Sequence, residues 1–134
     1  MAPAGVELIV GARRDPQFGP LVLVGIGGVL AEVLDDVVVR IAPIDAGHAK
    51  QMLDELRGAR LLDGVRGRRG VNRTAVAEII AGLGRALEAH PAWREVDLNP
   101  VIAGREAIAV DALIVADVRD PDWDYEDPGG GAHA

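Results

Sequence analysis

The most constraining feature of the sequence is a polar and apolar alternation that runs into a proline, over residues 95–100 (EVDLNP). Side chains alternate across a β-strand with a period of two, so Glu95, Asp97 and Asn99 are expected on one face. Pro100 lacks a backbone donor and favours an extended residue before it, which predicts that the strand stops there. The segment therefore predicts a row of side-chain oxygens at a strand end.

The residues that follow can return beside this strand. After Gly104 the chain can turn, and the apolar run 107–110 can form an antiparallel partner. That return would carry Asp111 back beside Asn99. A carboxylate and an amide oxygen side by side suit a hard cation such as Mg²⁺. Taken from spacing alone, an acidic alternation of this kind is usually an ordinary solvated face.

Composition limits the class of protein. The chain has 134 residues, of which 49% are hydrophobic and 26% charged, enough for one domain with a sizeable core and unlike a disordered chain. The net charge of -7 argues against general nucleic-acid or anionic-membrane binding, and the absence of cysteine excludes disulfides and thiolate zinc sites. The longest apolar stretch, residues 20–31, is interrupted by glycines and is too short to span a bilayer. We therefore expect a cytoplasmic protein with no nucleic-acid and no membrane partner.

The first forty residues have strand character. Apolar and alternating runs predict strands over residues 6–12, 21–26, 29–34 and 37–41. Turn residues separate them, including the Gly27-Gly28 pair and Asp35-Asp36. This pattern predicts a hairpin-rich, mostly antiparallel sheet.

The hydrophobic period then changes to that of helices. Asp45 is a suitable N-cap for a helix from Ala46 to about Arg57, and Asn72 for a second helix from about residue 73 to 89. A loop is expected between them, over residues 61–67. The order of strands, two helices and strands predicts an α+β fold, a mostly antiparallel sheet with two helices packed on one face.

Acidic residues accumulate from Asp117 onward, before three consecutive glycines near the end. We expect one folded domain over residues 1–116 and a disordered acidic tail over residues 117–134.

Six short segments together resemble a known family. They are 5–11 (GVELIVG), 14–20 (RDPQFGP), 25–33 (GIGGVLAEV), 62–67 (LDGVRG), 97–100 (DLNP) and 110–112 (VDA). In this order they resemble the carboxy-terminal part of the ATP-grasp domain of NDP-forming acyl-CoA synthetases. That family includes ADP-forming acetate–CoA ligase and is related to the succinyl-CoA synthetase β subunit. The resemblance covers residues 5–115 and implies an ATP-grasp carboxy-terminal subdomain.

The resemblance implies an activity and a metal. Such enzymes interconvert ATP, a carboxylic acid and CoA with ADP, phosphate and an acyl-CoA, through an acyl phosphate and a phosphohistidine. ATP sits between two subdomains, and Mg²⁺ bridges its phosphates. The resemblance implies that Asn99 and Asp111 are metal ligands, and that Asp97 orients the metal or its water. The metal would neutralise the developing phosphoryl charge.

The resemblance also implies nucleotide contacts. Glu32, which follows Gly27 and Gly28, matches the family's Gly-Gly-x-x-x-Glu, and the glycines would let the backbone approach a phosphate. A tight turn is an equally good explanation of the two glycines. Glu7 could face the nucleotide or solvent, and Arg66 could contact a phosphate or a neighbouring domain.

Two further groups have ordinary explanations. An arginine cluster in the middle of the chain is compatible with a solvated face or with an anion contact. Its members are Arg57, Arg60, Arg66, Arg68, Arg69 and Arg73. None of the histidines, His48, His90 and His133, resembles the family's phosphohistidine, which belongs to a different domain. We therefore assign no catalytic residue.

The family's ATP-grasp domain is longer than this chain. Its amino-terminal subdomain supplies nucleotide-binding lysines and most of the adenine pocket, and separate CoA-binding and ligase domains complete the enzyme. We therefore expect the isolated chain to be inactive and to need these parts in cis or in trans, and a homo-oligomer is compatible with this. The alternatives are a non-catalytic interaction or regulatory module, or a degenerate synthetase region of a protein acyltransferase.

Overall fold

A computed structural model describes residues 5–28, 35–64 and 69–117. The elements in these ranges are β1 (Val6–Asp15), β2 (Gly19–Ile26), β3 (Val37–Ile41), α2 (Ala46–Glu55), the 3-10 helix η2 (Ala59–Asp63), α3 (Arg73–Ala89), β4 (Trp93–Ala103), β5 (Ala107–Ala109) and β6 (Ala112–Ala116).

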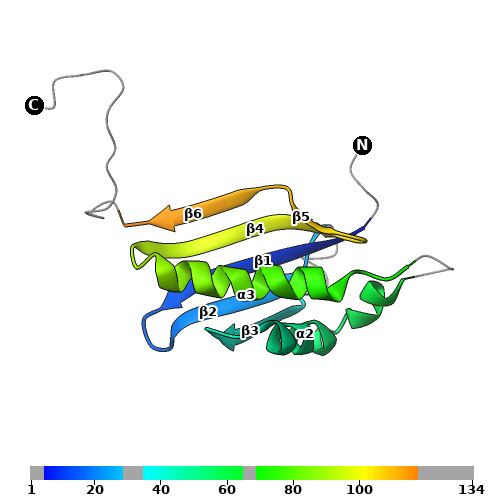
Figure 1. The fold of residues 1–134 in the computed structure, drawn as a ribbon, viewed down its shortest axis with the longest axis horizontal. Coiled ribbons are helices and arrows are strands. Elements are labelled where there is room, and N and C mark those ends of the chain that lie inside the picture. The colour runs from blue at the N-terminus through cyan, green and yellow to red at the C-terminus, as the bar shows by residue number, and fades with distance from the viewer. Residues whose placement is uncertain (1–4, 29–34, 65–68, 118–134) are drawn as a thin grey trace, which may run out of the picture.

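The strands form one antiparallel sheet in the order β3-β2-β1-β4-β5. The strand β6 also pairs with β4. It pairs with residues 93–98 of β4, whereas β5 pairs with residues 101–103. Both α2 and α3 lie on one face of this sheet, and the other face carries no helix of the described ranges (Figure 1). We call this second face the open face. The predicted α+β fold with two helices on one side of an antiparallel sheet is confirmed.

The core lies between the sheet and the two helices. Leu8 and Val10 of β1 are fully buried, and their partners on β2, Ile26 and Val24, are buried on the same side. Burying a side chain of this size stabilises the folded state by about 1.5–3 kcal/mol. Since side chains alternate along a strand, the residues between these buried ones point to the open face.

The helices α2 and α3 begin at the residues that the sequence indicated. The Asp45 side chain accepts the N–H of His48 at 2.8 Å, and the Asn72 side chain accepts the N–H of Ala75 at 3.1 Å. These bonds satisfy donors that have no partner within the helix. The two predicted N-caps are therefore confirmed.

Helix α3 is tied to β4 at both of its ends. At its start, the N–H of Asn72 donates to the carbonyl of Gly104, just beyond β4, at 2.7 Å. At its other end Arg14 reaches across from β1 and donates to the carbonyls of His90 at 3.0 Å and Trp93 at 2.8 Å. A guanidinium suits this position because the C-terminal end of a helix carries partial negative charge.

The prediction that the strand stops at Pro100 is wrong, because β4 continues to Ala103. The pairing of β4 with β1 shifts register between Leu98 and Val101, so Pro100 falls within a bulge. A proline is tolerated at a bulge because no ladder bond requires its missing N–H. Its carbonyl still accepts the N–H of Val110 at 2.9 Å.

The segment between the helices also differs from expectation. Helix α2 ends at Glu55, and the predicted loop begins as the 3-10 helix η2. The helix ends early because the N–H groups of Arg57 and Gly58 donate to the Asp36 side chain.

Three predictions lie wholly or partly outside the described residues: the strand over 29–34, the loop around Arg66, and the acidic tail beyond Asp117. None of the described helices combines the length and the apolar composition that crossing a membrane requires.

Candidate functional site

The open face of the sheet carries a line of charged side chains along β1 and β4. On β1 the residues that alternate with the buried ones are Glu7, Ile9, Gly11 and Arg13. On β4, Asp97 is in register with Gly11 of β1 on one side and with Leu113 of β6 on the other. Residues in register share a face, so Asp97 lies on the open face with Glu7 and Arg13.

Asn99 and Asp111 are neighbours, as the sequence predicted. The N–H of Asn99 donates to the carbonyl of Asp111 at 3.2 Å. Leu98, which precedes Asn99, packs against the core and is in register with Ala112, so Asn99 and Asp111 belong to the open face. The Asp111 side chain accepts the N–H of Ala112 at 2.9 Å, which holds the carboxylate at the start of β6.

A second group of candidates lies where β2 ends beside the start of β1. The N–H of Gly27 donates to the carbonyl of Glu7 at 2.8 Å. Gly28 has a φ of +68°, which disfavours residues with a side chain. The Glu7 carboxylate also lies against Gly28, so that a Cβ at this position would overlap it. The structure therefore brings Glu7, Gly27 and Gly28 together.

The two groups occupy different positions along the same face. Glu7 is in register with Ile102 of β4, whereas Asp97 is in register with Gly11. Glu7 and Gly11 are four residues apart on β1, which corresponds to roughly 13 Å. Asn99 lies within the bulge between these positions. A single ion could not contact both groups, but an elongated ligand lying along β1 and β4 could.

The donor chemistry fits a magnesium ion that also binds a ligand. Asn99 and Asp111 are exposed and Asp97 is half-buried, so all three can offer oxygen atoms. In the described ranges, no three His, Asp or Glu side chains gather into a metal-binding group. Magnesium does not need such a group, because it is often held by one or two carboxylates together with waters and substrate phosphates.

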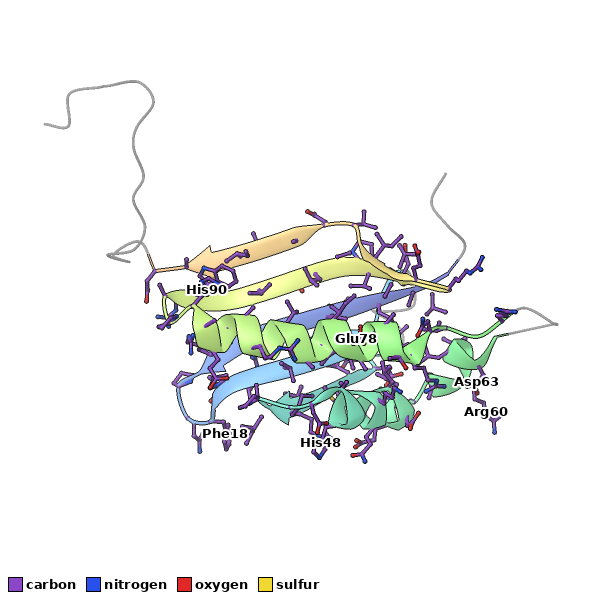
Figure 2. The ribbon with its side chains drawn as sticks, in the orientation of Figure 1. Phe18, His48, Arg60, Asp63, Glu78 and His90 are labelled. Atoms are coloured by element: carbon purple, nitrogen blue, oxygen red, sulfur yellow. The ribbon has the colours of Figure 1, made fainter. Side chains whose placement is uncertain are left out.

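The arginine cluster is partly explained by internal contacts. Arg73 donates to the side chains of Asp54 and Asp63, each at 2.7 Å, and thereby links the start of α3 to α2 and η2. Arg57 lies beside Asp36, with Nε at 3.9 Å from its carboxylate. Arg60 is exposed on η2, at the same end of the molecule as Asp63 (Figure 2), and it forms no such ion pair with any described residue. The arginines with these contacts have structural roles.

Two candidate residues, Glu32 and Arg66, lie outside the described residues. One open-face residue was not singled out from the sequence: Arg13, in register with Glu95 of β4. The alternation of Arg13 with the apolar residues of β1 was the available signal.

Comparison with known proteins identifies the class to which this fold belongs. The chain belongs to the ATP-grasp domain family, whose model matches residues 1–116. Its relatives are acyl-CoA synthetases. Over 116 residues it is 45% identical to subunit beta of an ADP-forming acetate–CoA ligase I from Pyrococcus furiosus, which covers 86% of this chain and 50% of that protein. Over 120 residues it is 45% identical to a trans-feruloyl-CoA synthase of an unknown prokaryotic organism, which covers 87% of this chain and 17% of that protein.

A solved structure agrees with these matches. Acetyl-coenzyme A synthetase 1 of Ca. Korarchaeum cryptofilum, in complex with coenzyme A and Mg-AMPPCP, is 42% identical with a TM-score of 0.81, covering 87% of this chain and 55% of that one. The chain thus spans about half or less of the length of the proteins it matches, and it corresponds to a partial ATP-grasp region.

Proposed function

We propose that this chain forms part of the Mg²⁺-nucleotide site of an NDP-forming acyl-CoA synthetase, an enzyme that converts a carboxylic acid, CoA and ATP into an acyl-CoA, ADP and phosphate. The observation that carries the proposal is the adjacency of Asn99 and Asp111 on the open face of an ATP-grasp chain. In this proposal the chain acts in the cytoplasm with the remaining ATP-grasp subdomain and the CoA-binding and ligase domains. It does not catalyse the reaction alone.

The proposed metal ligands are the side chains of Asn99 and Asp111. Asp97 is in register beside Leu113 on the same face and would orient the metal or one of its waters. Magnesium bound there would neutralise negative charge on the phosphates. The remaining coordination positions would be filled by phosphate oxygens and water.

The proposed nucleotide contacts are Glu7, Gly27 and Gly28, together with Glu32 and Arg66. Gly28 supports a close approach, because its positive φ disfavours a side chain and the backbone is left uncovered there. The open face carries the carboxylates of Glu7 and Asp97, which repel a phosphate chain in the absence of a cation. The proposal therefore requires that nucleotide binding depends on Mg²⁺.

Calorimetric titration of the full chain with ADP tests the proposal. We expect heat of binding with Mg²⁺ and none with EDTA. Asn99→Ala and Asp111→Ala should each abolish the signal. Glu88→Ala, which removes an exposed carboxylate on α3, is the matched control and should leave the signal unchanged.

A chain that covers only part of its relatives can lack affinity for ADP, because the residues on the opposite side of the nucleotide site are missing. The same titration is therefore repeated with the uncovered part of a relative's β subunit added in trans. Binding that appears only with this addition, and disappears in both variants, supports the proposal. No binding in either arrangement overturns it and favours the non-catalytic interaction module.

A further inference from the structure

The strand β6 is an apolar strand at an exposed position. All five of its residues, Ala112–Ala116, are apolar. Leu113 is 59% exposed, Ile114 48% and Val115 41%, and these residues alternate between the two faces of the sheet. Consecutive apolar residues are typical of strands that are covered on both faces. The side chains of β6 are therefore as apolar as those of a buried interface, although they are exposed at the edge of the sheet.

The outer edge of β6 offers backbone groups for pairing. Within the described part of the chain, β6 pairs only with β4. The N–H of Asn99 donates to the carbonyl of Asp111, so these two residues face each other as a hydrogen-bonded pair of the β4–β6 ladder. Alternate residues of an antiparallel strand direct their N–H and C=O to opposite sides. The backbone groups of Ile114 therefore point away from β4.

The opposite edge of the sheet is protected in a way that β6 is not. On β3, the Arg40 side chain donates to the carbonyl of Val39 at 2.8 Å and forms an ion pair with Glu55 of α2. Charged side chains and covering helices are the usual means of preventing pairing at an edge. The strand β6 contains no charged residue, and α3 lies over β1 and β2 rather than over β6 (Figure 1).

We propose that β6 accepts an additional β-strand from a partner protein, and that this strand is apolar with basic residues at its ends. Charge complementarity selects this partner. Asp111 and Asp117 bracket β6. Arg94 lies 3.5 Å from the Asp117 carboxylate and offsets part of this negative charge, but the chain as a whole has a net charge of -7. A second copy of the chain is a poorer occupant, because antiparallel pairing of two β6 strands would bring Asp111 opposite Asp117. Strand addition to an exposed edge is a common mode of peptide recognition.

The probe is a synthetic peptide that alternates valine with threonine and carries lysines at both ends. We expect saturable binding to the full chain, measured by fluorescence anisotropy, that weakens with added salt. The same peptide with glutamates in place of the lysines should bind at least about tenfold more weakly, which is a difference of about 1.4 kcal/mol in binding free energy. Equal binding of the two peptides overturns the assignment of a basic partner.

A pair of variants separates strand addition from simple hydrophobic adhesion. Ile114→Pro removes an N–H that points away from β4, so the existing ladder is retained, and a proline is accepted on an edge in this orientation. It should abolish peptide binding, whereas Ile114→Thr, which keeps the N–H, should retain it. Unchanged binding by Ile114→Pro overturns the proposal.

Asp117→Lys gives an independent variant if Ile114→Pro does not fold. It reverses the charge at one end of β6 and should weaken the lysine peptide about fivefold. Unchanged affinity would contradict the charge argument.

Hydrogen exchange of the full chain supplies a further check. The amide of Ile114 should exchange fast in the free chain and slowly with the lysine peptide. Protection in the free chain would show that the edge is already covered and would overturn the proposal. Analytical ultracentrifugation of the free chain shows whether a second copy of the chain covers the outer edge of β6 instead.

Discussion

The carboxylate of Asp36 accepts the backbone N–H of Gly58 at 2.6 Å and that of Arg57 at 2.8 Å. Asp36 is only 4% exposed, so these bonds lie inside the fold between the start of β3 and the end of α2. Removing a buried acceptor leaves its donors unsatisfied, at about 1–3 kcal/mol for each group.

We therefore predict that Asp36→Ala lowers the free energy of unfolding by about 2–4 kcal/mol, measured by urea denaturation. Glu78→Ala, at an exposed position of α3 (Figure 2), should change it by less than about 0.5 kcal/mol. Equal effects of the two substitutions would contradict the role given to Asp36.

Arg14 should also be important for stability. Its guanidinium donates to the carbonyls of Leu87, His90 and Trp93 at the end of α3. Arg14→Met keeps the aliphatic part of the side chain and removes the donors, and we predict a loss of about 1–3 kcal/mol in the free energy of unfolding. Arg13→Met, on the open face of the same strand, is the matched control and should cost far less.

The capping carboxylate of α2 should make stability depend on pH. The N–H of His48 holds the pKa of Asp45 below its ordinary value of 3.8. A carboxyl whose pKa is lower in the folded state stabilises that state above its ordinary pKa, and this contribution disappears as pH falls through the folded value. Asp45→Ala should therefore be destabilised at pH 7, and the difference from wild type should shrink in acid.

Asp45→Asn is the control for this prediction. Asparagine is also a good N-cap but does not titrate. It should retain the cap at pH 7 and remove this part of the pH dependence. Thermal unfolding of the three proteins between neutral and acidic pH measures both effects.

Two glycines of α3 should respond differently to substitution. At Gly82 a Cβ would meet only the end of Arg85, at 3.6 Å, so Gly82→Ala should stabilise the chain by about 0.5–1 kcal/mol. At Gly84 a Cβ would lie 3.3 Å from Val22 and 3.4 Å from Ala42. Gly84→Ala should therefore gain less, and Gly84→Leu should be destabilised by overpacking. Guanidinium denaturation ranks the three variants.

Much of the fold could be predicted from the sequence because local signals agree with tertiary packing. The N-caps Asp45 and Asn72 and the helical hydrophobic period of residues 73–89 are local signals. The structure confirms them, and the buried residues of α3, which include Val76, Ile80 and Leu87, form its apolar stripe. The continuation of β4 through Pro100 could not be predicted, because it depends on a register shift against a strand about ninety residues earlier. The early end of α2 depends similarly on the distant carboxylate of Asp36.

The candidate site was predictable only in part. Alternation and a turn were sufficient to place Asn99 beside Asp111, and the structure confirms this placement. The contact of Glu7 with Gly28 could not be derived in the same way, because it depends on the pairing of β1 with β2 and on a positive φ. The metal and nucleotide roles of these residues remain predictions for the titrations described above.

Helix α3 and strand β4 form a closed ring. Their covalent connection closes one end, and the bond from Asn72 to Gly104 closes the other. A helix rises about 1.5 Å per residue and a strand about 3.3 Å, so the two sides cannot absorb the same insertion equally. One residue added to α3 would also rotate its apolar stripe by about 100° away from the sheet. Natural variation in length should therefore be rare within this ring, and a family alignment free of gaps there would be its evolutionary signature.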